Sequence, residues 1–297
     1  MTYTEFNRPI VEEFRANGGV VGGPFAGMPL LLLTTTGRRS GAPRTSPLAY
    51  REDGRGRPVV FATNAGGDDH PTWYANLVAN PRVTVEIGTS SYTATAIPAP
   101  EEERERLHAE MMASSEAYAS YAARTSRTFP AVVLYRVDED RERALGSELV
   151  RIHESLRNDL MDVLESSAFG TDAPSAPLLE RLRTHCLTVC GDLESHHTKE
   201  NGVFPRIEQQ FPALAPMLDD LRRQHAVLAG KRAELESLCA RTDLADEERR
   251  EGVERIVAEI DAHFADEERR LVPVLDVLDP ATVGRPQLPG PDGADRK

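Results

Sequence analysis

The spacing of apolar residues changes near residue 140, and this change constrains the fold more than any other feature of the sequence. Before it, short runs rich in β-branched residues alternate with glycine and proline, as in strands separated by turns. After it, apolar residues recur at helical spacing and strand-like runs almost disappear. A chain of 297 residues has room for about two domains. The sequence therefore predicts an α+β multidomain protein in which a strand-rich domain precedes a helical one.

The first half predicts six strands joined mostly by short turns. Their ranges are 30–35, 44–50, 58–63, 82–87, 91–97 and 131–137. Helical patterns accompany them at 4–16, 71–80 and 101–121. Gly88, Thr89 and Ser90 are expected to form a tight turn between the fourth and fifth strands. Short connections of this kind favour an antiparallel sheet or barrel.

The second half predicts four amphipathic helices, which indicates an up-down-up-down four-helix bundle. Their expected ranges are 147–168, 177–200, 213–239 and 246–269. Breaks are expected at 170–177, at Gly202 with 205–212, and at 242–243. The resulting division is a domain at 1–138, a linker at 139–148, a bundle at 149–278 and a disordered tail at 279–297.

Composition and charge limit the partners that the protein is expected to bind and the compartment in which it is expected to be found. The net charge of -13 argues against a nucleic-acid or anionic-membrane partner. No apolar run reaches the roughly 20 residues of a membrane span, and the N-terminus lacks a signal-peptide core, so a cytoplasmic protein without an integral membrane segment is expected. Three cysteines are too few for a disulfide framework. Cys186 and Cys190, one helical turn apart, are interpreted as small core residues rather than a redox pair.

Six of the eight histidines fall in the predicted bundle, with at least one on each helix. They are His153, His185, His196, His197, His225 and His263. His196 and His263 are each followed four residues later by a glutamate, Glu200 and Glu267, so each pair projects from one stripe of its helix. Imidazoles and carboxylates that converge from four helices build two-metal sites, and the absence of thiolates suits iron or manganese. Satisfied core or surface histidines are the alternative, but chance seldom places one on every helix and repeats the His-x-x-x-Glu spacing.

The stretches HESLR, HHTKENGVFP, RRQH and HFADEE, between about 150 and 278, resemble the hemerythrin-like (HHE cation-binding) family. The resemblance implies a non-haem di-iron site that binds oxygen or nitric oxide; manganese or mixed metals are the alternative. The implied ligands are His153, His196, Glu200, His225, His263 and Glu267. Ala229 stands where oxygen-carrying hemerythrins have a further histidine, which puts five-histidine oxygen carriage in question. His185 and His197 are alternative replacements: His185 lies close to the face of His196, whereas His197 is displaced by about 100°.

Two stretches of the first half carry groups that suit an anionic ligand. LLLTTTGRRSGAPRTSPLAY contains a basic loop after its first strand, and arginines beside a hydroxyl and glycines can bind phosphate or carboxylate. A solvated hairpin turn is the alternative. NAGGDDHPTWYAN leads from a glycine-rich turn into a helix, and helix N-termini favour anions. Trp73, the only tryptophan, is expected to pack in the core rather than stack on a ligand.

Together with YASYAARTSRTFPAVVL, these stretches resemble the deazaflavin-dependent nitroreductase family of split β-barrels over about 25–137. The resemblance implies coenzyme F420 and hydride transfer to a small-molecule acceptor: a nitro compound, quinone or enone. It places the phosphate end of the cofactor on Arg38, Arg39, Ser40, Arg44 and Thr45. It places the ring beside Pro47, Leu48, Asn64, Ala65, Gly66, Gly67, Trp73 and Asn76. Tyr118 and Tyr121 match the family's tyrosine-rich segment near the substrate and are the candidate catalytic residues. FMN or haem is the alternative cofactor, and since related barrels often dimerise, a homodimer is one assembly that the resemblance allows.

The leading hypothesis is therefore a fused redox protein with a deazaflavin-dependent reductase barrel and a di-iron bundle. In one version the barrel supplies electrons to the iron centre, which acts as an oxidase or oxygenase or reduces nitric oxide. In another the bundle senses or stores oxygen, nitric oxide or iron and gates the barrel. In a third, both domains are only binding modules for cofactor and iron.

Overall fold

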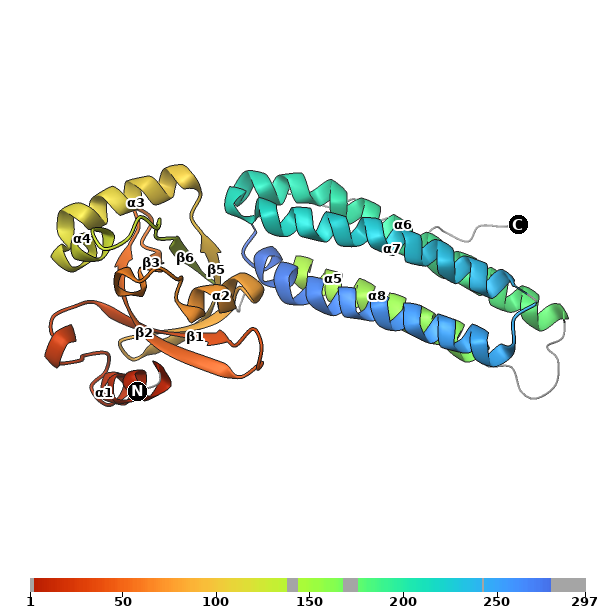
Figure 1. The fold of residues 1–297 in the computed structure, drawn as a ribbon, viewed down its shortest axis with the longest axis horizontal. Helices are drawn as coiled ribbons and strands as arrows, with labels where there is room; N and C mark the ends of the chain where they lie inside the picture. The colour runs from red at the N-terminus through yellow and green to blue at the C-terminus, as the bar shows by residue number, and fades with distance from the viewer. Residues whose placement is uncertain (1–2, 138–143, 168–175, 242, 279–297) are drawn as a thin grey trace.

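The protein is described by a computed structural model, which covers residues 3–137, 144–167, 176–241 and 243–278. It contains a β-barrel flanked by helices and, beside the barrel, an elongated bundle of four helices (Figure 1). This arrangement confirms the predicted order of a barrel followed by a bundle. The expected tail at 279–297 and the expected break at 170–177, apart from its last two residues, lie outside the described residues.

Six strands close into an antiparallel barrel in the order β1-β2-β3-β6-β5-β4. Their bounds are β1 Leu30–Thr36, β2 Pro43–Glu52, β3 Pro58–Phe61, β4 Arg82–Ile87, β5 Ser90–Pro98 and β6 Ala131–Arg136. Every predicted strand is present, and the largest shift of an end is two residues. Gly88 has a φ of 57°, a left-handed conformation that glycine adopts without strain, in the tight turn between β4 and β5.

Both faces of β1 are buried, which explains its unbroken run of leucines. Leu31 and Leu33 point into the barrel core with Val60 and Val85. Leu30 and Leu32 pack outside the barrel with Phe14 of α1 (Tyr3–Ala16). The helix before the first strand is thereby fixed on the outer side of the barrel, where it can reach the loop between β1 and β2.

Three more helices surround the barrel: α2 Thr72–Ala79, α3 Glu101–Ser114 and α4 Glu116–Ala122. The single helix expected at 101–121 is wrong, because the chain is extended at Ser115. The Ser115 side chain accepts a hydrogen bond from the backbone N–H of Tyr118 and so caps α4. The break turns α4 back toward the barrel beside Asn64–Gly66.

The turn between β2 and β3 is organised by one carboxylate. Asp53 accepts hydrogen bonds from the backbone N–H groups of Arg55 and Arg57 at 2.8 and 3.0 Å, and from the Arg57 side chain at 2.7 Å. Burial by itself raises the pKa of Asp53, but the hydrogen bonds from Arg57 and Arg55 outweigh burial and hold that pKa below its usual value.

The bundle consists of α5 Ala144–Ser167, α6 Ala176–Gln210, α7 Ala215–Ala240 and α8 Asp246–Leu275. The predicted break at Gly202 and Pro205 is wrong, since α6 continues through both residues and ends before Phe211. An internal proline costs a helix about 3 kcal/mol, but Phe204 and Ile207 are buried on this part of α6, and their packing offsets that cost. No described helix is both long enough and apolar enough to span a membrane.

The bundle core contains all three cysteines. Cys186, Cys190 and Cys239 are buried in one apolar cluster, where the sulfur atoms of Cys186 and Cys190 lie 3.9 Å apart. The contact with Cys186, and then burial, raise the pKa of Cys190. The contact with Cys190 lowers the pKa of Cys186, but the contact with Cys239 and burial outweigh it and raise that pKa to about 12, so both stay protonated thiols at neutral pH. The structure agrees with their interpretation as core residues.

The barrel and the bundle meet in an apolar seam. The ring of Tyr135 in β6 packs against Phe211, with centroids 5.4 Å apart. The Thr95 hydroxyl donates a hydrogen bond of 2.7 Å to the carbonyl oxygen of Pro273 in α8. Arg82 of β4 forms an ion pair with the buried carboxylate of Asp276. These contacts join the end of the bundle to the β4–β5–β6 side of the barrel.

Candidate functional site

A cavity of about 870 Å³ lies beside the barrel, between the β1–β2 loop, α1 and α2. Seven of the residues predicted to bind the cofactor line it: Arg38, Arg39, Ser40, Arg44, Thr45, Trp73 and Asn76. Within the described part of the chain, Arg38, Arg39 and Arg44 form no ion pair, and their side chains are exposed. The cavity therefore offers three guanidinium groups to an anionic ligand.

The buried side chain of Asn76 holds the basic loop in place. Its amide nitrogen donates to the Thr35 hydroxyl at 3.1 Å, and its oxygen accepts from the backbone N–H of Arg38 at 3.1 Å. Asn76 thus ties α2 to the end of β1. Trp73 is 2% exposed and packs in the barrel core, as predicted, with only part of its surface in the cavity wall.

Sequence reasoning missed the contribution of α1. Asn7, Arg8, Val11, Glu12 and Arg15 line the cavity, although they lie more than twenty residues before the basic loop. The sequence offered no signal for this contact, because it depends on α1 packing over β1.

His70 is another lining residue, and its hydrogen bonding fixes its protonation. Its Nδ1 lies 2.8 Å from a nitrogen of Arg127. Because a guanidinium can only donate, Nδ1 accepts and the proton resides on Nε2. Burial and the charge of Arg127 lower the pKa of His70, which keeps the ring neutral at neutral pH.

The other residues predicted at the cofactor ring lie apart from this cavity. Pro47, Leu48, Asn64, Ala65, Gly66 and Gly67 do not line it. Asn64, Ala65 and Gly66 have φ values of 48°, 51° and 81°, an unusual run of left-handed residues that marks a tightly constrained loop. Arg127 donates to the carbonyl oxygens of Thr63 and Gly67 and clamps this loop from both ends.

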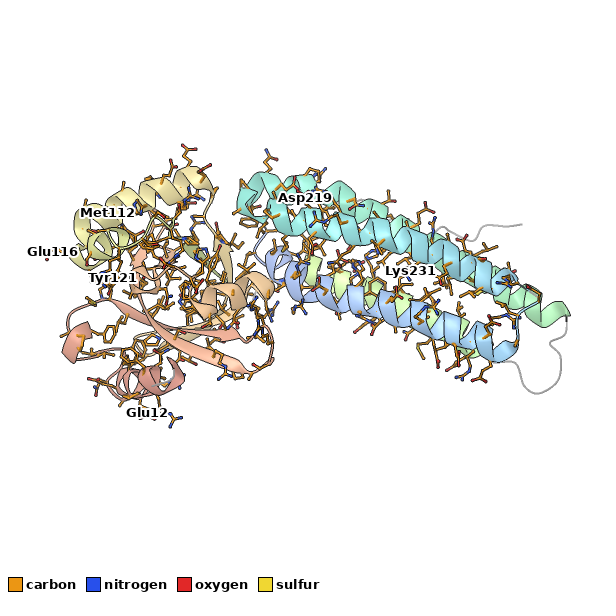
Figure 2. All side chains as sticks on the ribbon, viewed as in Figure 1. Glu12, Met112, Glu116, Tyr121, Asp219 and Lys231 are labelled. Carbon is orange, nitrogen blue, oxygen red and sulfur yellow. The ribbon has the colours of Figure 1, made fainter. Side chains whose placement is uncertain are left out.

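The two candidate catalytic tyrosines are not brought into the cavity. Tyr118 is 3% exposed and packs between Phe61 and Phe129, with its hydroxyl 2.9 Å from Nδ1 of His108. Burial raises its pKa to about 12, so its hydroxyl stays protonated. Figure 2 shows Tyr121 on the α4 side of the barrel, away from Glu12 of the cavity wall. A catalytic role for either tyrosine stays a prediction.

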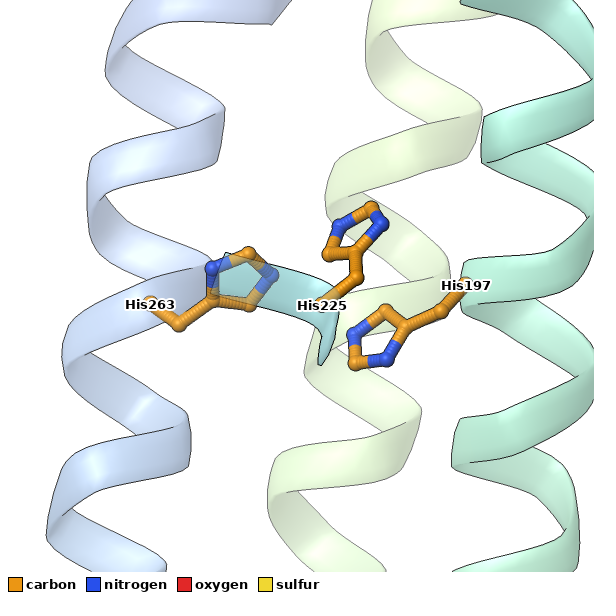
Figure 3. Close-up of side chains that lie close together, drawn as sticks. All are labelled: His197, His225 and His263. Atoms are coloured by element: carbon orange, nitrogen blue, oxygen red, sulfur yellow. The ribbon is translucent and has the colours of Figure 1, made fainter. Parts of the chain in front are cut away.

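The bundle brings together, from its four helices, seven side chains that could bind metal ions, in two adjacent groups. One group contains His153, His196, Glu200 and Glu267, and the other contains His197, His225 and His263. Within each group the ligand atoms lie within 4.8 Å of one another, and all seven side chains are buried. The second group converges from α6, α7 and α8 (Figure 3).

The two glutamates lie between the groups. Glu200 Oε2 stands 3.3 Å from Nε2 of His196 and 3.7 Å from Nε2 of His225. Glu267 Oε2 stands 3.6 Å from Nε2 of His153 and 3.3 Å from Nε2 of His263, and its Oε1 stands 3.6 Å from His225. Each carboxylate therefore has members of both groups within reach, as bridging ligands require.

Hydrogen bonds outside the centre aim three of the imidazoles inward. Nδ1 of His153 donates to Glu268 at 2.9 Å, Nδ1 of His225 to Asn201 at 3.1 Å, and Nδ1 of His263 to Gln224 at 2.8 Å. With the proton on Nδ1, the lone pair of each ring is on Nε2, which faces the centre. Sequence reasoning missed these three acceptors, although each lies within or next to a quoted histidine motif.

The donor atoms fit metal ions better than they fit one another. Both carboxylates, and Nε2 of His197, His225 and His263, are buried without a hydrogen bond. Buried polar atoms are rarely left unsatisfied unless an ion or water completes them. Nε2 of His153 and Nε2 of His196 are 2.9 Å apart. Adjacent ligands on an octahedral ion with bonds of about 2.1 Å are spaced by roughly this distance.

The protonation states also suit metal binding. Burial and neighbouring imidazoles lower the pKa of His196 to about 3 and that of His197 to about 2, so both rings are neutral bases at neutral pH. Burial and the charge of Glu267 raise the pKa of Glu200 well above its usual value. Burial would also raise the pKa of Glu267, but the facing His225 and His263 lower it. A cation would relieve the repulsion between the two carboxylates.

Comparison with known proteins assigns both domains. Residues 6–136 match the F420H2-dependent quinone reductase family, and residues 145–279 match the hemerythrin HHE cation-binding domain. The F420H2-dependent quinone reductase Rv1261c of Mycobacterium tuberculosis is 35% identical over 127 residues, which are 41% of this chain and 85% of that protein. The chain belongs to the F420H2-dependent quinone reductase family. Its C-terminal domain is a hemerythrin HHE cation-binding domain.

Two solved structures are similar to the reductase domain. One, an F420H2-dependent reductase named FDR-A, is 36% identical and covers 36% of this chain and 93% of its own, with a TM-score of 0.33. The other, described as a domain-swapped dimer, is 32% identical and covers 45% of this chain and 99% of its own, with a TM-score of 0.34.

Membership of both families confirms the two resemblances found in the sequence, and the two domains imply F420 and metal cofactors. Of the two alternatives for the additional histidine, the structure places His197 with His225 and His263 in a group that could hold a metal ion. The side chain of His185 lies outside the described residues.

Proposed function

We propose that the protein is an F420H2-dependent oxidoreductase whose barrel transfers hydride to a small-molecule acceptor, and whose bundle holds a di-iron centre that binds oxygen or nitric oxide. A quinone is the acceptor that the reductase relatives favour; nitro compounds and enones are the other candidates. The proposal of a di-iron centre rests above all on one observation: two buried carboxylates and three buried imidazoles have no hydrogen-bond partner and face one another.

The barrel cavity supports the cofactor assignment through its charge. Arg38, Arg39 and Arg44 would hold the phosphodiester end of F420, because guanidinium groups form paired, charge-assisted hydrogen bonds with phosphate oxygens. Asn76 would keep that loop in a binding conformation without touching the phosphate. When bound, reduced F420 supplies the hydride. His70, neutral with its proton on Nε2, can donate a hydrogen bond to a group in the cavity.

The bundle centre supports a pair of metal ions. His153 and His196 would bind one ion, and His197, His225 and His263 the other, with Glu200 and Glu267 shared between them. Imidazole and carboxylate ligands without thiolate favour iron, with manganese or a mixed pair as the alternative. When bound, the ions supply a reducible centre where a small ligand can coordinate.

A second function, in which the bundle senses oxygen, nitric oxide or iron and influences the barrel, draws support from the seam. Thr95 bonds to the carbonyl of Pro273, only six residues after Glu267 on the same helix. A change at the metal centre that moved α8 would therefore reach β5 of the barrel. Reduction of oxygen by electrons from the barrel is a separate proposal, which would make the protein an oxidase or oxygenase.

The proposal is tested by two measurements on one preparation of full-length protein. Iron per chain is measured after anaerobic loading, and oxidation of reduced F420 is followed with a quinone and then with oxygen as sole acceptor. The proposal predicts two irons per chain and turnover with the quinone. Turnover with oxygen that requires bound iron would favour the oxidase. Turnover with the quinone whose rate changes when nitric oxide is added to the iron-loaded protein would favour the sensor. Absence of both iron and turnover would contradict the whole proposal.

A further inference from the structure

A further cavity, of about 470 Å³, lies in the seam between the barrel and the bundle. Its barrel wall comes mainly from α2, β5 and the start of β6. Figure 1 shows α2 on the side of the barrel that faces the bundle. The bundle wall is formed, just before and at the start of α7, by Ala213, Leu214, Pro216 and Met217. The bundle therefore encloses a space, here called the interdomain cavity, that the barrel alone would leave open on this side.

The interdomain cavity adjoins the cavity beside the β1–β2 loop at His70, which forms part of both walls. The following helix, α2, separates the two cavities along its length. Trp73 and Asn76 line the cavity beside the β1–β2 loop, whereas Tyr74 and Leu77 line the interdomain cavity. A ligand in the interdomain cavity would thus be next to a ligand in the other cavity, with the N-terminal end of α2 between them.

Most of the interdomain cavity wall is apolar. Leu77, Val78 and Met217 contribute their side chains to it. Val78 is 52% exposed, which is unusual for a large apolar residue beside a cavity. Cavities of this size with mainly apolar walls and a few polar groups are typical of small-molecule sites. A ligand with an apolar body would cover the exposed part of Val78 and gain from its burial.

The polar side chains of the wall can all donate a hydrogen bond. Neutral His70 carries its proton on Nε2, and the ring of Tyr74 lies 5.1 Å from that of His70, measured between centroids. Burial raises the pKa of Tyr74, so its hydroxyl stays protonated. Among the described residues of the wall only Arg104 is charged, and its guanidinium is paired with Glu101 at 3.2 Å. A neutral ligand with a carbonyl oxygen fits these groups better than a carboxylate does, because the one cation of this wall already has a partner.

We propose that the interdomain cavity binds the hydride acceptor of the barrel, a neutral apolar molecule with a carbonyl oxygen, and that Met217 of the bundle limits its size. The inference rests on the proposed reductase function and adds to it a site to which both domains contribute. His70 and Tyr74 hold the carbonyl oxygen by hydrogen bonds, and the start of α7 encloses the apolar body. A quinone in this site takes up the hydride and the proton that F420H2 loses and becomes a hydroquinone, so no further oxidant or reductant is needed.

The test uses menadione, a small quinone, as the probe and full-length protein. Its dissociation constant is measured by equilibrium dialysis without F420, and its KM from the anaerobic oxidation of reduced F420. Met217→Trp on the bundle wall and Val78→Trp on the barrel wall should each raise both values at least about tenfold, because the indole fills part of the cavity. The dissociation constant of F420 should stay unchanged in both. Val227→Trp, at a position on α7 that is 63% exposed and outside the cavity, is the matched control and should bind menadione as the wild type does.

Two measurements test the chemical class of the ligand. Tyr74→Phe removes one donor and keeps the ring, so it should weaken menadione binding by roughly threefold to tenfold, as expected for one hydrogen bond. Naphthoate, a carboxylate of similar size, should bind the wild type at least about tenfold more weakly than menadione. Equal or tighter binding of naphthoate would overturn the assignment to a neutral carbonyl compound.

An enlarged cavity provides a second test, because Met217 also packs against the apolar cluster of the seam. Met217→Ala should raise kcat/KM for a naphthoquinone with one isoprene unit relative to that for menadione. An unchanged ratio in this variant, or an unchanged KM for menadione in both tryptophan variants, would overturn the acceptor site while the reductase function stands. Wild-type protein that binds menadione but does not oxidise reduced F420 with it would instead contradict the proposed function, on which the inference rests.

Discussion

Replacing Glu200 by glutamine should have opposite effects with and without metal. In the metal-free protein both oxygens of Glu200 are buried without a hydrogen bond, and burial and the charge of Glu267 raise its pKa. An unsatisfied buried polar group costs about 1–3 kcal/mol, and more if it is charged. Glu200→Gln removes the charge at constant shape, so it should stabilise the metal-free bundle by roughly 1–3 kcal/mol. With iron present the substitution should have the opposite effect, because iron that binds only the folded state stabilises it, and Glu200→Gln weakens that binding.

Iron at a thousandfold excess over its dissociation constant stabilises the wild type by about 4 kcal/mol per site. If the substitution weakens iron binding by about a hundredfold, the excess falls to tenfold and the gain to about 1.4 kcal/mol. At about 4 °C per kcal/mol for a domain of this size, the rise in melting temperature for each iron that binds shrinks from roughly 16 to roughly 6 °C.

The assay is thermal unfolding followed by circular dichroism, with a chelator or with iron(II) under anaerobic conditions. Asp192→Asn, an exposed position on α6 two turns before Glu200, is the control. Its melting temperature should match that of the wild type both with the chelator and with iron(II). A ligand role for Glu200 would be refuted if Glu200→Gln were less stable than the wild type without metal. It would also be refuted if iron raised the melting temperature of Glu200→Gln as much as that of the wild type.

Three further predictions concern the barrel. Arg44→Ala should weaken F420 binding about tenfold through loss of a charge-assisted contact, measured by fluorescence titration; Arg55→Ala, on an exposed turn, should not, and equal affinities would remove Arg44 from the site. Gly66→Ala should lower the melting temperature of the barrel by several degrees, because φ is 81° and the new Cβ would lie 2.7 Å from a backbone oxygen of α4; Gly54→Ala, where nothing lies within 4 Å, should be tolerated, and equal losses would contradict this. Asp53→Asn should cost about 1–3 kcal/mol at pH 7. Since folding lowers the pKa of Asp53, that stability is present above the unfolded pKa of about 3.9 and is lost as pH falls through the folded value. Urea unfolding at pH 7 and at acid pH should show the difference from wild type shrinking, and a difference independent of pH would be incompatible with this account.

Most of the fold was predictable because local pattern and tertiary structure agree. Alternating and β-branched runs predicted all six strands, and helical spacing predicted the four bundle helices. The failures occurred where packing overrides local preference. Pro205 predicts the end of a helix, but burial of Phe204 and Ile207 carries α6 beyond it. Ser115 splits a continuous helical pattern into two helices through a side-chain cap that the apolar spacing does not reveal.

The candidate metal centre was more predictable than the cavity beside the barrel. Its residues recur at helical spacing, and the bundle topology alone requires them to converge. On α6 the candidate ligands occupy more than the stripe that His196 and Glu200 share, however. His196 and His197 belong to different groups, because adjacent residues project about 100° apart around α6. The cavity of the barrel depends on α1 crossing β1, a contact between distant segments that leaves no mark on spacing or composition.

We propose above all that the barrel is an F420H2-dependent reductase. The most direct test is the rate at which full-length protein oxidises reduced F420 with a quinone under anaerobic conditions, compared with an Arg38→Ala/Arg44→Ala double variant. We predict turnover in the wild type, with or without iron in the bundle, and a loss of at least about a hundredfold in kcat/KM in the double variant. Wild-type oxidation no faster than the uncatalysed reaction, or equal rates in the two proteins, would contradict the account.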